Sequence, residues 1–125
     1  QLRWVEDGEA VGYNGTWRAR GRRRLATLSV GYADGYPRAA SSAGDEARGV
    51  AIVAGRRCPF AGRVSMDLII LDVTEVAPDA VRRGDPAVLI GDGLDVDEVG
   101  ARANTIGYEI LTSLGTRFHR RYVGG

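Results

Sequence analysis

The chain has 125 residues, of which 44% are hydrophobic and 26% charged, and its formal net charge at pH 7 is +1. This length suits one domain with a modest core, and the composition argues against a disordered tail or a fibrous repeat. No apolar run approaches the roughly 20 residues that span a bilayer, and the amino terminus lacks a secretory signal pattern. We therefore expect one cytoplasmic domain over residues 1–125.

Short runs rich in β-branched and aromatic residues alternate with glycine-containing turns along the first three quarters of the chain. Their spacing of about 8 to 12 residues is typical of an antiparallel sandwich or a small barrel. The predicted strands are Leu2–Val5, Val11–Tyr13, Thr16–Arg18, Leu25–Val30, Val50–Ala54, Phe60–Val64, Leu68–Val73 and Ala87–Ile90. We therefore predict a mainly β fold, a small closed barrel of Greek-key type.

The last quarter of the chain changes to a helical pattern. Asp95 followed by Glu98 resembles a capping box. Apolar residues then recur at helical spacing, namely Val96, Val99 and Ala103. A second short helix is expected after a cap at Asn104 or Thr105, ending near Gly115. One or two short helices are thus predicted near the C-terminus, before a basic tail.

All 17 basic residues are arginines, so the chain has no ε-amino group. An enzyme that holds pyridoxal phosphate covalently needs a lysine, and so does a Walker phosphate-binding loop. Neither is expected from this chain alone. The only methionine is Met66, and the chain opens at Gln1 within a predicted β region, so we expect a piece of a longer protein.

Several common kinds of site find little support. The single histidine, His119, and the single cysteine, Cys58, form no metal-ligand pair, so no metal site is expected. That histidine also lies far from any serine motif, which argues against a nucleophilic triad. The basic run at 18–24 is more often a solvated hairpin than a nucleic-acid contact, and the charge balance is even. No nucleic-acid partner is expected.

Three uncommon strings stand out where a strand ends or a helix begins. They are LSVGYADGYPR at 28–38, GRVSMD at 62–67 and NTIGYE at 104–109. Taken singly, Tyr32 in the first string is more often a turn anchor, and Met66 in the second a residue that fills a core gap. Tyr108 in the third would rest on the sheet from a helix. Together the strings are the main functional signal of the sequence.

The strings, in this order and at these separations, resemble the C-terminal domain of the alanine racemase family, and GYNGT at 12–16 and RRYV at 120–123 agree with it. The resemblance covers essentially the whole chain. It implies a β-rich domain that accompanies an N-terminal (β/α)8 barrel, absent from this chain, whose lysine holds pyridoxal 5′-phosphate. It also implies a homodimer in which this domain docks on the partner subunit, and interconversion of L- and D-alanine that supplies D-alanine for peptidoglycan.

The resemblance also implies roles for three residues. Tyr32 matches the tyrosine that reaches into the partner subunit's active site as one of two acid–base groups, the barrel lysine being the other. Met66 matches the position whose backbone amide contacts the substrate carboxylate, and Tyr108 matches a tyrosine beside the cofactor phosphate. Ser65 stands where many relatives have cysteine, and we expect this change to leave the Met66 contact intact. The strings also contain residues without an assigned role, Tyr36, Arg38 and Asp67.

Two alternatives stay open. The chain could be a stand-alone β-barrel binding or docking module that uses its arginine-rich hairpin. It could also belong to a racemase of another amino acid such as serine, because a pocket discriminates only modestly between side chains that differ by a hydroxyl. On the racemase reading the isolated chain is expected to be inactive, since it lacks the lysine. Its oligomeric state is not predicted.

Overall fold

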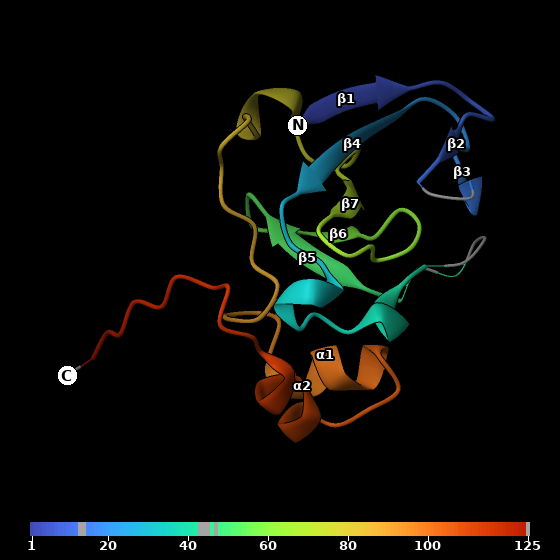
Figure 1. Ribbon diagram of the computed structural model, residues 1–125. Helices are drawn as coiled ribbons and strands as arrows, with labels where there is room; N and C mark the ends of the chain where they lie inside the picture. Colours follow the sequence, from blue (N-terminus) through green and yellow to red (C-terminus); the bar gives the residue numbers. More distant parts are fainter. Residues whose placement is uncertain (13–14, 43–45, 47, 125) are drawn as a thin grey trace.

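The computed structural model describes residues 1–12, 15–42, 46 and 48–124, in which short strands occupy one end of the molecule and two helices the other (Figure 1). The strands are β1 Leu2–Val5, β2 Ala10–Val11, β3 Trp17–Arg18, β4 Arg23–Leu28, β5 Val50–Val53, β6 Arg56–Pro59 and β7 Ile69–Asp72. The helices are α1 Val96–Arg102 and α2 Gly107–Ser113, with 3-10 turns η2 Tyr32–Asp34, η3 Arg38–Ala40 and η4 Pro78–Ala80. The mainly β class with two short C-terminal helices is confirmed.

The strands pair in three small antiparallel sheets. The largest has the order β1-β4-β7, so that Leu25 in the central strand lies between Arg3 and Asp72. The other two are the hairpins β2–β3 and β5–β6. Single bridges connect these pieces, one between Ile52 and Val88 and one between Phe60 and Leu71. The first string, 28–38, therefore begins where the central strand of the largest sheet ends.

The closed Greek-key-like barrel predicted from the strand spacing is not seen in the described residues. The ladders span only two to six residues and leave three separate sheets joined by single bridges, which do not close a barrel. The spacing of turn signals was compatible with either arrangement, because it reports how often the chain reverses and not which strands pair. Tyr13, at the end of one predicted strand, lies outside the described residues.

Two further strand predictions are wrong. The strand expected at 60–64 lies instead at β6, because Ala54 and Gly55, with φ of 51° and 77°, reverse the chain directly after β5. A two-residue turn with both φ values positive is the one that matches the twist of a hairpin. The strand expected at 87–90 is reduced to a bridge at Val88, and the residues around it line a cavity.

The core lies between the largest sheet, the β5–β6 hairpin and the helices. It is built from fully buried side chains of several elements, including Ala51, Cys58, Phe60, Leu71, Leu94, Val99 and Ile110. Burying a side chain such as Phe60 stabilises the fold by about 2 to 3 kcal/mol. A smaller cluster around Val5 and Leu25 fills the space under β1–β3. Both helices are thus anchored on the sheets. No helix in the described ranges is long and apolar enough to cross a membrane.

Two glycines allow α1 and α2 to approach each other closely. A Cβ atom on Gly100 would lie 2.7 Å from the carbonyl carbon of Ile106, and one on Gly107 would lie 2.3 Å from a carboxylate oxygen of Asp97. The predicted cap of α1 is confirmed, since Asp95 accepts a hydrogen bond from the Glu98 backbone N–H at 2.8 Å. The caps proposed for α2 are wrong, because its N-cap is Ile106.

Glu98 links α1 to the β5–β6 hairpin. Its carboxylate pairs with the guanidinium of Arg57 on β6 and with that of Arg102 one helical turn later, the latter at 2.8 Å. Arg102 also donates to the Arg48 carbonyl at 3.1 Å. Hydrogen bonds from Arg57 and then Arg102 lower the pKa of Glu98 from 4.5 to about 2. The ionised carboxylate therefore helps hold the helical end of the molecule on the sheet.

Glu98→Gln is expected to lower the urea midpoint at pH 7 and to have little effect near pH 2. The pKa of Glu98 is depressed in the folded state, so its contribution is complete above about pH 4.5 and is lost as pH falls toward about 2. The measurement is urea unfolding of the wild type and the variant at several pH values. Glu75→Gln, an exposed carboxylate on the β7–η4 connection, is the control. A difference that stays constant with pH would contradict the ion-pair explanation.

Candidate functional site

The first string forms a sharp turn directly after β4. Its 3-10 turn η2 ends at Gly35, which has φ of 97° and donates its N–H to the Tyr32 carbonyl at 3.0 Å. Asp34 is buried, and its Oδ2 accepts a hydrogen bond from Gly31 N–H at 3.0 Å, which closes the turn. Tyr32 lies on the outer side of this turn with 42% of its surface exposed.

The second string lies directly against this turn. Tyr32 N–H donates to the Ser65 carbonyl and Ala33 N–H to the Met66 carbonyl, both at 3.0 Å. A Cβ atom on Gly31 would lie 2.2 Å from the Ser65 oxygen, so the two backbones can approach only because residue 31 is glycine. The structure therefore brings Tyr32 and Met66 together, although they are 34 residues apart in the sequence.

Two hydrogen-bond donors at this junction have no acceptor in the described part of the chain. The Met66 backbone N–H and the Tyr32 hydroxyl donate to no acceptor among the described residues. Met66 is 53% exposed, so its side chain does not fill a gap in the core, which is the role that a methionine without further context would suggest. The Ser65 hydroxyl donates to the Leu68 carbonyl at 2.9 Å and leaves the Met66 amide free. An amide N–H and a phenol hydroxyl without acceptors, on two segments that are hydrogen-bonded to each other, are donors of the kind that bind a small anionic ligand.

The third string meets the same turn through the far end of its helix. A Cβ atom on Gly35 would lie 1.8 Å from the Ser113 carbonyl oxygen, and Gly115 N–H donates to the Asp34 carbonyl at 3.0 Å. Tyr108 lies in the first turn of α2, about 8 Å along the axis from Ser113. It is 80% exposed, and among the described residues it makes no hydrogen bond or ring contact with Tyr32 or Met66.

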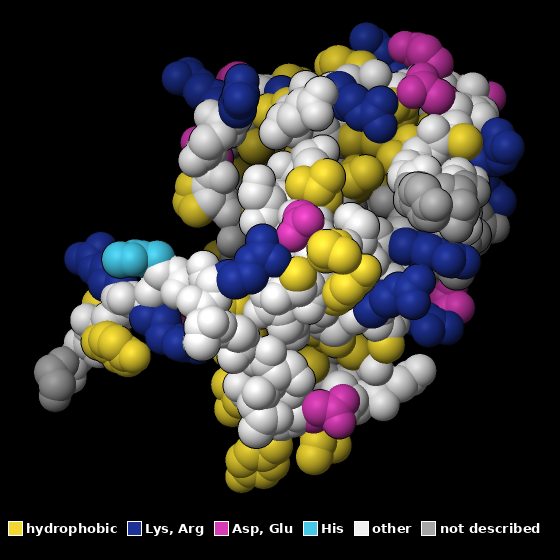
Figure 2. All heavy atoms as spheres, in the orientation of Figure 1, with side chains coloured by type: hydrophobic (Ala, Val, Ile, Leu, Met, Phe, Trp, Pro, Cys, Tyr) yellow, Lys and Arg dark blue, Asp and Glu magenta, His cyan; other side chains and the backbone are white. Residues whose placement is uncertain are grey.

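Large apolar side chains are exposed in and beside the second and third strings. Besides the three candidate site residues, they are Leu68, Ile106 and Leu111. Hydrophobic side chains project from the end of the molecule that α2 forms (Figure 2). Exposed apolar side chains that gather in one region mark a surface that contacts another molecule or domain.

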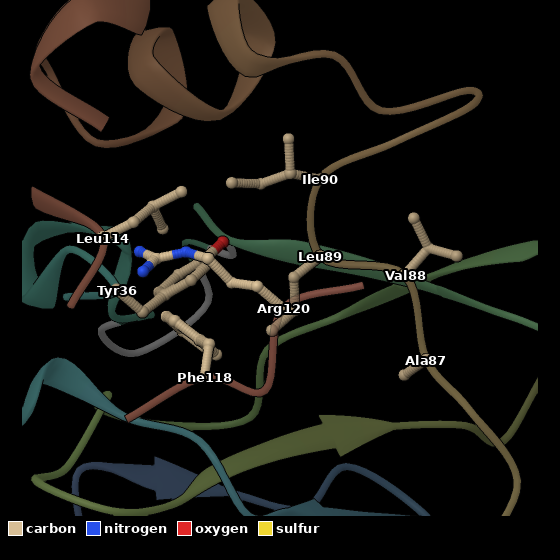
Figure 3. Close-up of a pocket in the computed structure, with 8 residues that line it drawn as sticks. All are labelled: Tyr36, Ala87, Val88, Leu89, Ile90, Leu114, Phe118 and Arg120. Carbon is tan, nitrogen blue, oxygen red and sulfur yellow. The ribbon is translucent and has the colours of Figure 1, made fainter. Parts of the chain in front are cut away.

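Tyr36 faces inward, in contrast to Tyr32. Its ring packs against Phe60 with 5.7 Å between ring centroids, and burial raises its pKa to about 12 although the charge of Arg102 lowers it. It lines a cavity of about 410 Å³ with Ala87, Val88, Leu89, Ile90, Leu114, Phe118 and Arg120 (Figure 3). Because Tyr36 is buried and its raised pKa holds it further from ionisation than an ordinary phenol, it packs the turn and is a poorer candidate for a general base than the exposed Tyr32.

One residue at this junction was missed by sequence reasoning. The Nε of Arg117 lies 3.2 Å from Oδ1 of Asp34, and its Nη2 lies 3.0 Å from Oδ1 of Asp67. The sequence shows Arg117 only as part of a basic tail. No spacing pattern connects position 117 with positions 34 and 67, so the bridge could be found only in three dimensions.

The arginine-rich segment 18–24 connects β3 to β4, which do not pair with each other, so the predicted hairpin is not seen there. Some of its arginines pair with other side chains of the chain. The guanidinium of Arg22 lies 4.3 Å from the centre of the Trp4 ring and 3.2 Å from a Glu6 carboxylate oxygen. Arg23 lies 3.6 Å from a carboxylate oxygen of Asp72. Acidic neighbours thus offset part of this charge, which favours a solvated segment over a nucleic-acid contact. No cluster of three or more metal-ligating side chains occurs in the described part of the chain.

Comparison with known proteins decides the family. The sequence model of the family described as alanine racemase, C-terminal domain, matches residues 1–122. The chain belongs to the alanine racemase C-terminal domain family. An alanine racemase from Methylobacterium nodulans is 64% identical over 125 residues, which cover 100% of this chain and 32% of that protein. A catabolic alanine racemase from Mesorhizobium japonicum is 50% identical, with 100% and 31% covered.

Solved structures agree with this assignment. The biosynthetic alanine racemase from Pseudomonas aeruginosa matches with a TM-score of 0.89 at 48% identity, over 99% of this chain and 33% of that one. The alanine racemase from Bartonella henselae with covalently bound pyridoxal phosphate gives a TM-score of 0.90 at 41% identity, over 98% and 33%. The chain thus spans about a third of the length of the alanine racemases that it matches.

Proposed function

We propose that this chain is the C-terminal domain of an alanine racemase and contributes residues to the interconversion of L- and D-alanine. The observation that carries the proposal is the junction of the first two strings, where an exposed tyrosine hydroxyl lies beside a loop with a free backbone amide. Residues 1–125 form the C-terminal part. The relatives are about three times as long, which supports a separate N-terminal (β/α)8 barrel that carries the lysine.

Tyr32 is proposed as one of two acid–base groups. Racemisation removes the Cα proton from one face and returns a proton to the opposite face, so it needs two groups on opposite sides of the substrate. The exposed hydroxyl of Tyr32 suits one side. A phenol is a weak acid, so its use as a base near neutrality requires positive charge close to its oxygen. That charge is expected from the assembled protein.

Met66 and Tyr108 are proposed to bind rather than to react. The free Met66 amide N–H is suited to donate to the substrate carboxylate. The Tyr108 hydroxyl, on an 80% exposed side chain without a partner in the described residues, is suited to donate to a phosphate oxygen of the cofactor. Ser65 leaves the Met66 amide free, which supports the expectation that serine is tolerated there.

The residues of this chain suit contact with a pyridoxal 5′-phosphate that is covalently attached to another domain. Donors on exposed side chains and loops suit its anionic groups, and the lack of lysine in this chain supports a covalent link on the proposed barrel. When bound, the cofactor spreads the negative charge that Cα carries after it loses its proton. Tyr32 would hold or deliver the proton at Cα, and Met66 would orient the carboxylate.

A homodimer in the cytoplasm is the proposed assembly and location. The exposed apolar side chains in and beside the second and third strings support contact of these segments with another domain. The occupant that we propose is the N-terminal barrel of the partner subunit, so that each active site takes Tyr32 from the neighbouring chain. Supply of D-alanine for peptidoglycan is the proposed use of the product.

The proposal is tested by racemisation of L-alanine and L-serine, with pyridoxal phosphate added. Two samples are compared, the chain alone and the chain joined to its lysine-bearing barrel. Alanine should be racemised only by the joined protein, and serine more slowly. No racemisation of alanine by a joined protein that binds the cofactor would exclude the proposal. Faster turnover of serine would support the serine racemase alternative.

A further inference from the structure

Arg117 connects the two loops that carry Tyr32 and Met66. Its guanidinium pairs with Asp34, two residues after Tyr32, at 3.2 Å, and with Asp67, next to Met66, at 3.0 Å. The same two loops are also joined by the backbone hydrogen bonds from the turn to the Ser65 and Met66 carbonyls. The separation of the two loops is therefore fixed by a backbone ladder and by one side chain.

The ion pair between Arg117 and Asp34 differs from a surface pair because the Asp34 carboxylate is buried. Its side chain is only 9% exposed, Oδ2 accepts the Gly31 N–H that closes the turn, and Oδ1 faces Arg117. A buried carboxylate requires pairing because its desolvation is costly. Asp67 is 57% exposed, so its pair with Arg117 contributes little stability but still orients the loop.

The tail that carries Arg117 is held on both sides of that residue. Gly115 N–H donates to the Asp34 carbonyl at 3.0 Å. Leu114 and Phe118 line the same cavity as Tyr36 (Figure 3). The guanidinium therefore approaches both carboxylates from a backbone that is itself anchored. A planar group with several donors can bridge two carboxylates at once, whereas the single ammonium of lysine acts as a point charge.

We infer that Arg117 is a positioning residue, which sets the distance and angle between the Tyr32 hydroxyl and the Met66 amide. The inference rests on the proposed function, in which one group moves the Cα proton and the other holds the carboxylate of the same substrate. A displacement of about 1 Å of one relative to the other costs up to about 10²-fold in rate. Loss of the bridge should therefore affect proton transfer more than binding or folding.

The experiment compares Arg117→Gln, Arg117→Lys and the control Arg121→Gln, in the protein that carries the barrel. It measures kcat and KM in both directions, Cα-deuterium isotope effects, cofactor absorbance and the thermal midpoint. Arg117→Gln should lower kcat by about 10- to 100-fold and change KM by less than about 3-fold. Its isotope effect should rise in one direction only, the one in which Tyr32 removes the proton, which Tyr32→Phe identifies separately. Arg117→Lys should recover part of kcat.

The outcomes separate this inference from the proposed function. If Arg117→Gln matches Arg121→Gln while Tyr32→Phe is impaired, the positioning role is overturned and the racemase proposal stands. If cofactor absorbance and the thermal midpoint fall, with isotope effects that change equally in both directions, Arg117 is merely structural and the inference is overturned. If Tyr32→Phe is unimpaired, the proposed function fails and the inference fails with it.

Discussion

Tyr32→Phe is expected to lower alanine racemisation by about 10²-fold or more while the cofactor stays bound. The substitution removes only the hydroxyl, which has no partner in the described residues, so the turn and its backbone bonds to Ser65 should persist. The measurement is the rate in both directions with cofactor absorbance checked, in the protein that carries the barrel. The loss follows from removing one of the two groups that exchange the Cα proton.

Tyr36→Phe provides the matched control. The same atom is removed four residues away, but Tyr36 is buried against Phe60 and its pKa of about 12 keeps it neutral. Its racemisation rate should stay within about 3-fold of the wild type, a small change by comparison with the loss of an acid–base group. Equal losses in both variants would mean that the hydroxyls stabilise the turn and would remove Tyr32 from its proposed role. An unchanged Tyr32→Phe would do the same.

Local patterns predicted the elements well where one short segment settles the structure. The strand at β1 and the cap at Asp95 were confirmed, and β4 lies two residues earlier than predicted, because β-rich runs between turns and helix caps are determined within a few residues. The hairpin turn at Ala54 and Gly55 was missed, since alanine with φ of 51° contradicts its local preference. The closed barrel is not seen in the described residues, and local patterns could not decide it because closure depends on pairing between distant strands.

The sequence named candidate site residues but not the geometry that relates them. The three strings named Tyr32, Met66 and Tyr108 through resemblance, whereas composition and spacing alone favoured packing roles. That Tyr32 and Met66 meet depends on Gly31, whose missing side chain allows the Ser65 carbonyl to approach. Arg117 belongs to the site through its ion pairs with Asp34 and Asp67, which are 83 and 50 positions away in the sequence. No periodicity in the sequence predicts contacts at these separations.

Gly35→Ala is expected to destabilise the chain by more than about 4 kcal/mol, a large part of the stability of a domain this size. The new Cβ would lie 1.8 Å from the Ser113 carbonyl oxygen and 3.0 Å from the Leu114 Cα, so the end of α2 would have to leave the turn. That movement would break the hydrogen bond from Gly115 N–H to the Asp34 carbonyl. Urea unfolding followed by circular dichroism measures the loss.

Gly84→Ala separates this contact from backbone strain. Gly84 has φ of 95°, close to the 97° of Gly35, but a Cβ there would meet nothing within 4 Å. It should therefore show only the cost of an alanine at positive φ, about 1 to 3 kcal/mol. The difference between the two variants reports the close approach of α2 to the turn. Equal losses of stability would show that the end of α2 does not lie in close contact with Gly35. The proposed contact between the helix of the third string and the Tyr32 turn would then be contradicted.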